Sequence, residues 1–380
     1  MIPYGRQDIR DDDVAAVAAV LHSDWLTQGP AVPRFEEAVA ARCGATHAVA
    51  VNSATSALHL ACISLDLKSG DHLWTTPNTF VASANCGRYC GATVDFVDID
   101  RDSLNLDPAA LAAKLERADK AGKLPKVVVA VDFAGQSCDM TAIRALADRY
   151  GFRIIEDASH AIGGRYQGQP VGNGRHADIT VFSFHPVKII TTGEGGMALC
   201  NDAALAERMA RLRSHGIRRD AAIQAAEGSW YYEQSELGFN YRMTDMQAAL
   251  GLSQLVRLDE YVAARHRLAD RYDHLLAGLP LQTPWRDPHA ESAWHLYVIR
   301  LEDSARRRAV FEHLRAAGIG VNVHYIPVHL QPDYRRLGFA PGDYPVAEDY
   351  YARAITLPLY PGLSDADQDR VVAELRTALA

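Results

Sequence analysis

Short apolar runs alternate with helical segments from residue 47 to about residue 200. Seven of these runs have the pattern of strands, and several, such as VVVAV and VFSF, are continuously apolar rather than alternating. Continuous apolar runs are typical of strands that are buried on both faces of a sheet. The expected strands are residues 47–52, 72–76, 94–99, 126–132, 152–156, 178–183 and 197–200.

Helical periodicity fills the gaps between these runs. The expected helices are residues 55–67, 80–90, 108–121 and 140–150. Strands that alternate with helices indicate an α/β fold, in which a mostly parallel sheet is covered by helices.

The pattern changes after Asp202. A polar, aromatic stretch at 218–239 shows no periodicity and is followed by a strongly helical segment at 244–279. The other expected elements are helices at 203–214, 305–317 and 365–379 and strands at 294–301 and 320–326. This order predicts two domains, a large one at 1–245 that includes an N-terminal arm and a smaller α+β domain at 246–380.

The composition is that of an ordinary globular protein, with 48% hydrophobic and 23% charged residues among 380. The net charge of −8 argues against a basic face for nucleic acid. No apolar run is long enough to span a bilayer, and the start, MIPYGRQDIRDDD, lacks a signal-peptide core. The six cysteines form no CxxC pair. We therefore expect a cytoplasmic protein with no membrane partner and no metal site.

One lysine stands in an unusually apolar segment. In FSFHPVKIITTGEGGM and its flanks, Lys188 and Glu194 are the only full charges between Asp178 and Asp202. An apolar setting disfavours the ammonium form and lowers the pKa of a lysine, as a Schiff-base lysine requires. A surface lysine whose stem lies over apolar neighbours would show the same pattern. Residues elsewhere in the chain must therefore distinguish the two interpretations.

Other strand ends offer what a pyridoxal phosphate site requires. Thr55 and Ser56 begin a helix after the first strand, where a phosphate could bind. Asp157 ends a buried strand and could pair with a pyridine nitrogen, and His160 follows it. Phe80 could stack on a ring. Each residue alone also fits helix capping, turn formation or core packing, but all lie at strand ends that share one crevice.

Longer motifs carry a family resemblance. The motifs are PYGRQDI, WLTQGPAVPRFE, NSATSAL, EDASHA, FSFHPVKIITTGEGG, LGFNYRMTDMQAALG and VNVHYIPVH, and they span nearly the whole chain. With them the chain resembles the DegT/DnrJ/EryC1/StrS family of sugar aminotransferases, a branch of the fold-type I pyridoxal phosphate enzymes. The resemblance implies a large domain with a mostly parallel seven-stranded sheet and a smaller C-terminal α+β domain.

The resemblance also implies roles for single residues. Lys188 would form the Schiff base with pyridoxal 5′-phosphate, and Asp157 would pair with its ring nitrogen. Asn240 would reach the phosphate of the adjacent subunit, so the active unit would be a homodimer with shared sites. The full set of implied cofactor contacts is Thr55, Ser56, Phe80, Asp157, His160, Ser183, Lys188 and Asn240.

The implied reaction moves an amino group from L-glutamate to the C4 ketone of a UDP-linked 4-keto-6-deoxy-N-acetylhexosamine. Cationic residues are expected to bind its diphosphate. The candidates for substrate binding are Arg213, His215, Arg218, His324, Tyr325 and His329. The basic residues of 211–220 fit a solvated turn equally well. A zinc site near His324 is disfavoured because Pro327 interrupts the segment.

Alternative functions divide into related and unrelated classes. Another nucleotide-linked keto sugar, of the bacillosamine, perosamine or 4-amino-arabinose type, would use the same motifs. A non-catalytic cofactor-binding regulator is a further alternative, although the chain has no spare segment for DNA binding. A nicotinamide enzyme is rejected because the GEGGMA segment is followed by a strand-like run and not by a helix. A sugar dehydratase of this fold would have histidine in place of Lys188.

Overall fold

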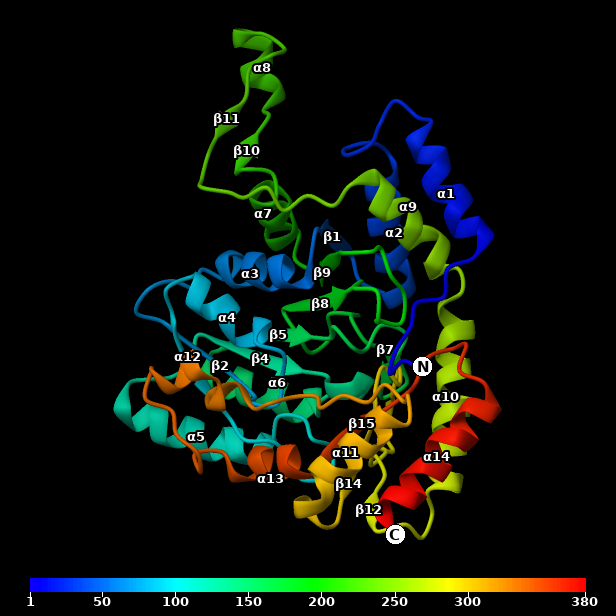
Figure 1. Cartoon of the computed structure of the whole chain (residues 1–380). Helices are drawn as coiled ribbons and strands as arrows, with labels where there is room; N and C mark the ends of the chain where they lie inside the picture. The colour runs from blue at the N-terminus through cyan, green and yellow to red at the C-terminus, as the bar shows by residue number, and fades with distance from the viewer.

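A seven-stranded sheet forms the centre of the molecule (Figure 1). The computed structural model describes residues 1–380. The strand order is β1-β9-β8-β5-β4-β2-β3, and β9 alone runs opposite to the other six strands, so the expected mostly parallel sheet is confirmed. Its strands are β1 (His47–Val51), β2 (His72–Thr75), β3 (Thr93–Phe96), β4 (Val127–Val131), β5 (Arg153–Asp157), β8 (Ile179–Ser183) and β9 (Gly196–Cys200).

Helices cover both faces of this sheet (Figure 1). Successive residues of β4 face different cores: Val127 and Val129 pack with α3 and α4, whereas Val128 packs with α5 and α6. This explains why the strand is apolar at every position. The helices of this part are α1 (Asp11–Leu21), α2 (Ala31–Cys43), α3 (Ala54–Ser64), α4 (Ala82–Tyr89), α5 (Pro108–Ala121), α6 (Met140–Tyr150), α7 (Ala203–Leu212) and α9 (Asp245–Leu255).

The expected single helix at 244–279 is wrong, because the chain breaks between α9 and α10 (Leu258–Leu275). Arg257 lies at the break, and its buried guanidinium bonds Asp12 at 2.5 Å and Asp13 at 2.6 Å on α1. α9 packs against α1 and α2. Along α10, Leu258 and Tyr261 pack into the core beside α2, whereas Leu268 and Tyr272 pack into the core of the C-terminal part.

The C-terminal part has its own core and a small sheet of order β12-β14-β15. The strand expected at 320–326 is wrong: Gly320 bonds Ile2 and Asn322 bonds Thr356, so the segment follows no single partner. The strand β15, which was not expected from the sequence, completes the sheet. The elements are β12 (Leu281–Gln282), β14 (Tyr297–Leu301), α11 (Arg307–Ala316), α12 (Pro332–Arg335), α13 (Pro345–Arg353), β15 (Ala354–Leu357) and α14 (Asp365–Leu379).

A projecting arm leaves the body of the molecule after α7 (Figure 1). It consists of the strands β10 (Ile217–Arg218) and β11 (Glu233–Gln234) with α8 (Ala221–Glu227) between them. A second small sheet contains β6 (Arg165–Tyr166), β7 (Gln169–Pro170) and β13 (Ala290–Glu291). None of the helices combines the length and apolar character needed to cross a membrane.

Candidate active site

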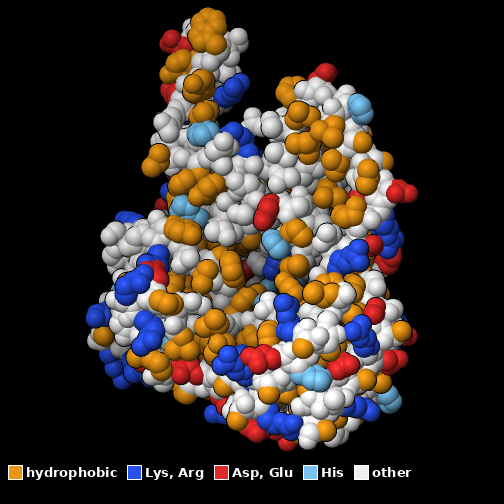
Figure 2. Space-filling model, viewed as in Figure 1, with side chains coloured by type: hydrophobic (Ala, Val, Ile, Leu, Met, Phe, Trp, Pro, Cys, Tyr) orange, Lys and Arg blue, Asp and Glu red, His pale blue; other side chains and the backbone are white.

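A cavity of about 770 Å³ opens at the carboxyl ends of the parallel strands. The face shown in Figure 2 is hollowed near its centre. Thr55, Phe80, Asp157 and Lys188 all line this cavity, as do His160 and Ser183. The crevice expected at the carboxyl ends of the strands is therefore present in the structure.

The start of α3 forms one end of the cavity. Ser53 caps the helix by accepting the N–H of Ser56 at 3.1 Å. The side chains of Thr55 and Ser183 line the same region, and neither hydroxyl has a partner in the chain. Gly196 lies behind this turn, where an added Cβ would be 2.4 Å from the backbone nitrogen of Ala54. Free N–H groups, hydroxyls and the helix dipole make this turn suited to a phosphate.

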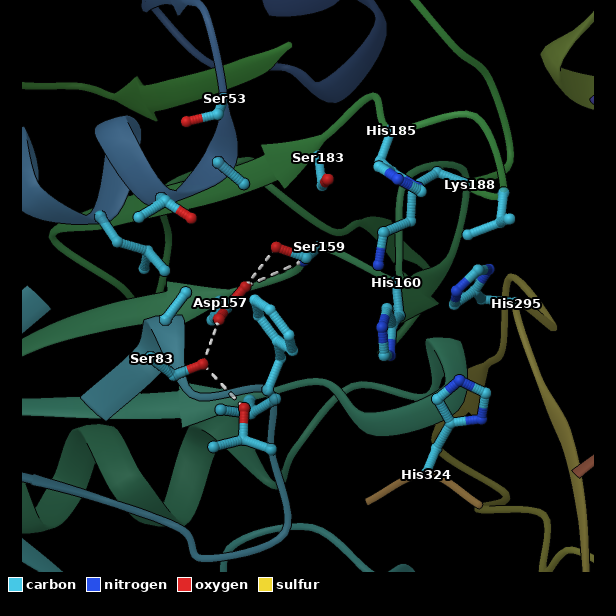
Figure 3. Close-up of a pocket in the computed structure, with 18 of the residues that line it drawn as sticks. Ser53, Ser83, Asp157, Ser159, His160, Ser183, His185, Lys188, His295 and His324 are labelled. Atoms are coloured by element: carbon cyan, nitrogen blue, oxygen red, sulfur yellow. Dashed lines mark hydrogen bonds between the residues drawn. The ribbon is translucent and has the colours of Figure 1, made fainter. Parts of the chain in front are cut away.

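Asp157 ends β5 and is held by two serines, as Figure 3 shows. Ser83 Oγ donates to Oδ2 at 2.6 Å, and Ser159 Oγ donates to Oδ1 at 2.5 Å. Thr79 in turn bonds Ser83 at 2.7 Å. These bonds fix the carboxylate, which is 5% exposed, at the wall of the cavity. Its negative charge would suit a protonated ring nitrogen.

Lys188 lies across the cavity from this carboxylate (Figure 3). Burial lowers the pKa of its amine to about 8, although the charge of Asp157 opposes the effect. No ion pair holds the ammonium group. The amine is therefore far more available as a nucleophile or base at neutral pH than an exposed lysine would be. Phe80, which is 59% exposed, offers a ring face to the same space.

A group of histidines closes the remaining side of the cavity. His160 Nδ1 accepts the backbone N–H of Ala134 at 3.3 Å, and Nε2 lies 3.1 Å from Tyr325 Oη. The ring of His295 packs 4.4 Å from that of His160. Burial lowers the pKa of both imidazoles well below the usual value, so both are neutral. His324 also lines this wall (Figure 3).

Several residues expected in the site lie elsewhere in this chain. Asn240 is exposed at the base of the arm and does not line the cavity. Arg213 donates to Glu36 and to the carbonyl of Ala50, and Arg218 pairs with Asp220 on the arm. His215 lies in the turn before β10, outside the cavity.

His329 is also outside the cavity, contrary to the expectation that it contacts the sugar. It is fully buried, and its Nε2 bonds Glu348 at 2.9 Å. Its ring lies near the core residue Phe96, with ring centroids 6.5 Å apart. Of the six residues proposed for substrate binding, only His324 and Tyr325 line the cavity.

Several residues of the cavity wall were not expected from the sequence. Ser83 could have been found, because it lies three residues after Phe80 and the expected helix at 80–90 would place both on one face. His295 and Tyr4 could not, since they reach the cavity from the small domain and the N-terminus. Figure 3 shows His295 next to Lys188 and His160.

Known proteins match this chain over almost its entire length. A sequence model described as the DegT/DnrJ/EryC1/StrS aminotransferase family matches residues 7–376. The chain belongs to this family. The family resemblance that the motifs carry is therefore confirmed, and the protein is an aminotransferase.

Individual members of the family are similar in sequence and in structure. The spore coat polysaccharide biosynthesis protein SpsC of Bacillus subtilis is 41% identical over 382 residues, which cover 99% of this chain and 96% of SpsC. Helicobacter pylori PseC is 32% identical with a TM-score of 0.91, and the match covers 100% of this chain and 99% of PseC. The PMP form of Spr1654 from Streptococcus pneumoniae is 33% identical with a TM-score of 0.91 over the same shares.

Proposed function

We propose that this family member uses pyridoxal 5′-phosphate to transfer an amino group from L-glutamate to the C4 ketone of a UDP-linked 4-keto-6-deoxy-N-acetylhexosamine. The observation that carries the proposal is the convergence of Lys188, Asp157 and the α3 turn on one cavity. Spr1654 has been solved in PLP and PMP forms, which supports the cofactor. PseC, described as an aminotransferase of pseudoaminic acid biosynthesis, supports the sugar class.

The residues of the cavity fit the cofactor. The α3 turn, with Thr55, Ser56 and Ser183, would hold its phosphate, and Asp157 would hold its ring nitrogen. Phe80 would cover one face of the ring. When bound, pyridoxal phosphate supplies an electron sink for the negative charge that develops on the reacting carbon.

Lys188 would carry the proton transfers. Its amine, with a pKa of about 8, takes a proton from the α-carbon of L-glutamate and later delivers one to C4 of the sugar. Asp157 stays in place because Ser83 and Ser159 both donate to it. His324 and Tyr325 would border the sugar, and neutral His160 would lie near the ring hydroxyl.

A homodimer would complete the site. Asn240 lies outside the cavity of its own chain, so we propose that it reaches the phosphate of a second copy. The arm exposes Trp230 and Tyr232, and the segment after it exposes Leu237. The end of α1 and its following turn expose Leu21 and Trp25. Figure 2 shows these two projections with hydrophobic side chains gathered on them. Exposed apolar side chains of this number are typical of a protein interface.

Absorbance spectra test the transfer. The purified protein with pyridoxal phosphate should show the visible band of a lysine-bound cofactor, lose it with L-glutamate and regain it with the keto sugar. Loss without recovery would reject this sugar class and favour another nucleotide-linked keto sugar. Absence of the band would reject the role of Lys188. A band that never responds to any amino donor would favour a non-catalytic regulator.

Mixed dimers test the shared site. Lys188→Ala and Asn240→Ala chains should each be poorly active alone. After mixing and exchange, one site of every mixed dimer is intact, so activity should return to about a quarter of the wild-type value. No recovery, with exchange shown by native mass spectrometry, would contradict the contribution of Asn240 across the interface.

A further inference from the structure

The hydroxyl of Tyr325 has a single partner in the chain. Its Oη lies 3.1 Å from His160 Nε2, and it makes no other hydrogen bond. Tyr325 lines the cavity next to Phe80, with ring centroids 6.3 Å apart. Which of the two partners donates decides whether the phenol offers a hydrogen or a lone pair to a bound molecule.

The backbone N–H of Ala134 identifies the donor of this hydrogen bond. His160 is neutral because burial lowers its pKa well below the usual value, so its ring carries one hydrogen. The N–H of Ala134 points at Nδ1 from 3.3 Å and has no other acceptor. A hydrogen on Nδ1 would face that N–H directly. The hydrogen of His160 is therefore on Nε2, which donates to Tyr325.

The phenol hydrogen of Tyr325 is consequently left without an acceptor in the protein. Burial raises the pKa of Tyr325, so the hydroxyl keeps its hydrogen. Oη already accepts from His160, and the open direction is the cavity. A half-buried donor without an acceptor is costly unless a ligand supplies one.

The turn that presents the Ala134 N–H is held in an unusual conformation. Ala134 has a φ of 59°, in the left-handed region that alanine seldom adopts. Leu296 N–H donates to the Ala134 carbonyl at 3.2 Å, and Ala293 N–H donates to the Gly135 carbonyl at 2.9 Å. Strained backbone that is fixed from outside is typical of functional sites.

We propose that Tyr325 is a hydrogen-bond donor reserved for an oxygen of the bound reactants, and that His160 is the positioning residue that fixes this direction. The acceptor is an oxygen either of the cofactor ring or of the sugar. Both oxygens would accept the same hydrogen bond, and binding and rate measurements distinguish them. The sugar source rests on the proposed function, whereas the hydrogen placement within the chain does not.

Two matched variants of His160 test the direction of its hydrogen bond with Tyr325, since one keeps the direction and the other reverses it. His160→Gln places an amide N–H near the position of Nε2 and keeps Tyr325 as a donor to the ligand. His160→Glu places an acceptor there and takes the phenol hydrogen. Tyr325→Phe is made in the wild-type, Gln and Glu backgrounds. Each comparison is between Tyr325 and its Phe variant in one background, so the effect of the added Glu charge is the same on both sides.

Two readouts identify the acceptor. The dissociation constant of pyridoxal phosphate reports a cofactor oxygen, and the single-turnover rate of the pyridoxamine form with the keto sugar reports a sugar oxygen. In the wild-type and Gln backgrounds, Tyr325→Phe should either raise this dissociation constant or lower this rate by about three- to tenfold. In the Glu background it should change neither. No cost in either readout would overturn the donor role. An equal cost in the Glu background would overturn the role of His160.

A direct measurement keeps the inference testable if His160→Glu fails to fold or if no sugar is turned over. Neutron diffraction from deuterium-exchanged crystals of the full wild-type chain locates the hydrogens. A deuteron on His160 Nε2 and a Tyr325 deuteron directed into the cavity are expected. A deuteron on Nδ1, or a Tyr325 deuteron directed at His160, would refute the inference whatever the reaction is.

Discussion

Replacing Lys188 with methionine should stabilise the cofactor-free protein at neutral pH. Burial lowers the pKa of Lys188 from 10.5 to about 8, so the fold disfavours its charge. A lowering of about 2.5 corresponds to a cost of about 3 kcal/mol when the lysine is protonated in both states. Lys188→Met removes this cost and keeps most of the side-chain volume.

The pH dependence distinguishes this effect from better packing. Between pH 8 and 10.5 the unfolded chain keeps a proton that the folded chain has lost, so the stability of the wild type rises with pH. The advantage of Lys188→Met should therefore fall from about 3 kcal/mol at pH 7 to less than about half of that at pH 9.5.

Urea unfolding of both cofactor-free proteins at the two pH values measures the difference. Lys123→Met is the matched control, because Lys123 is exposed and makes no ion pair. The control should show no comparable change with pH. A Lys188→Met protein that is less stable at pH 7, or whose advantage does not shrink at pH 9.5, would refute the reasoning about burial.

Three further substitutions test the site. Lys188→Ala should abolish amino transfer and leave the circular dichroism spectrum unchanged; residual transfer would contradict the central assignment. Gly196→Ala should weaken pyridoxal phosphate binding at least about tenfold and lower the melting temperature, since its Cβ would lie 2.4 Å from Ala54 N. Gly362→Ala, which has open space around it, is the control and should match the wild type. Ser83→Ala removes a 2.6 Å bond to Asp157 and should raise the dissociation constant of pyridoxal phosphate about tenfold without unfolding; an unchanged constant would argue against its role.

The α/β architecture and the chemical centre can be predicted from local patterns in the chain. Strands such as β4 are apolar at every position because both faces are buried, so their pattern is visible without a structure. The helices α5, α6 and α14 begin and end at the expected residues, because their periodicity and end signals are local. Lys188 was identifiable because it is an unusual charge within an apolar segment, and Asp157 because it ends a buried strand.

Features that depend on contacts between distant segments cannot be predicted from local patterns. At the break before α10, Arg257 meets carboxylates of α1, some 245 residues earlier in the chain. The segment 320–326 is not a strand because its polar groups bond Ile2 and Thr356. His329 lies outside the cavity and bonds Glu348, whereas His295 of the small domain lines it. Local sequence patterns indicate which residues are buried, but they do not indicate which distant residue each one contacts.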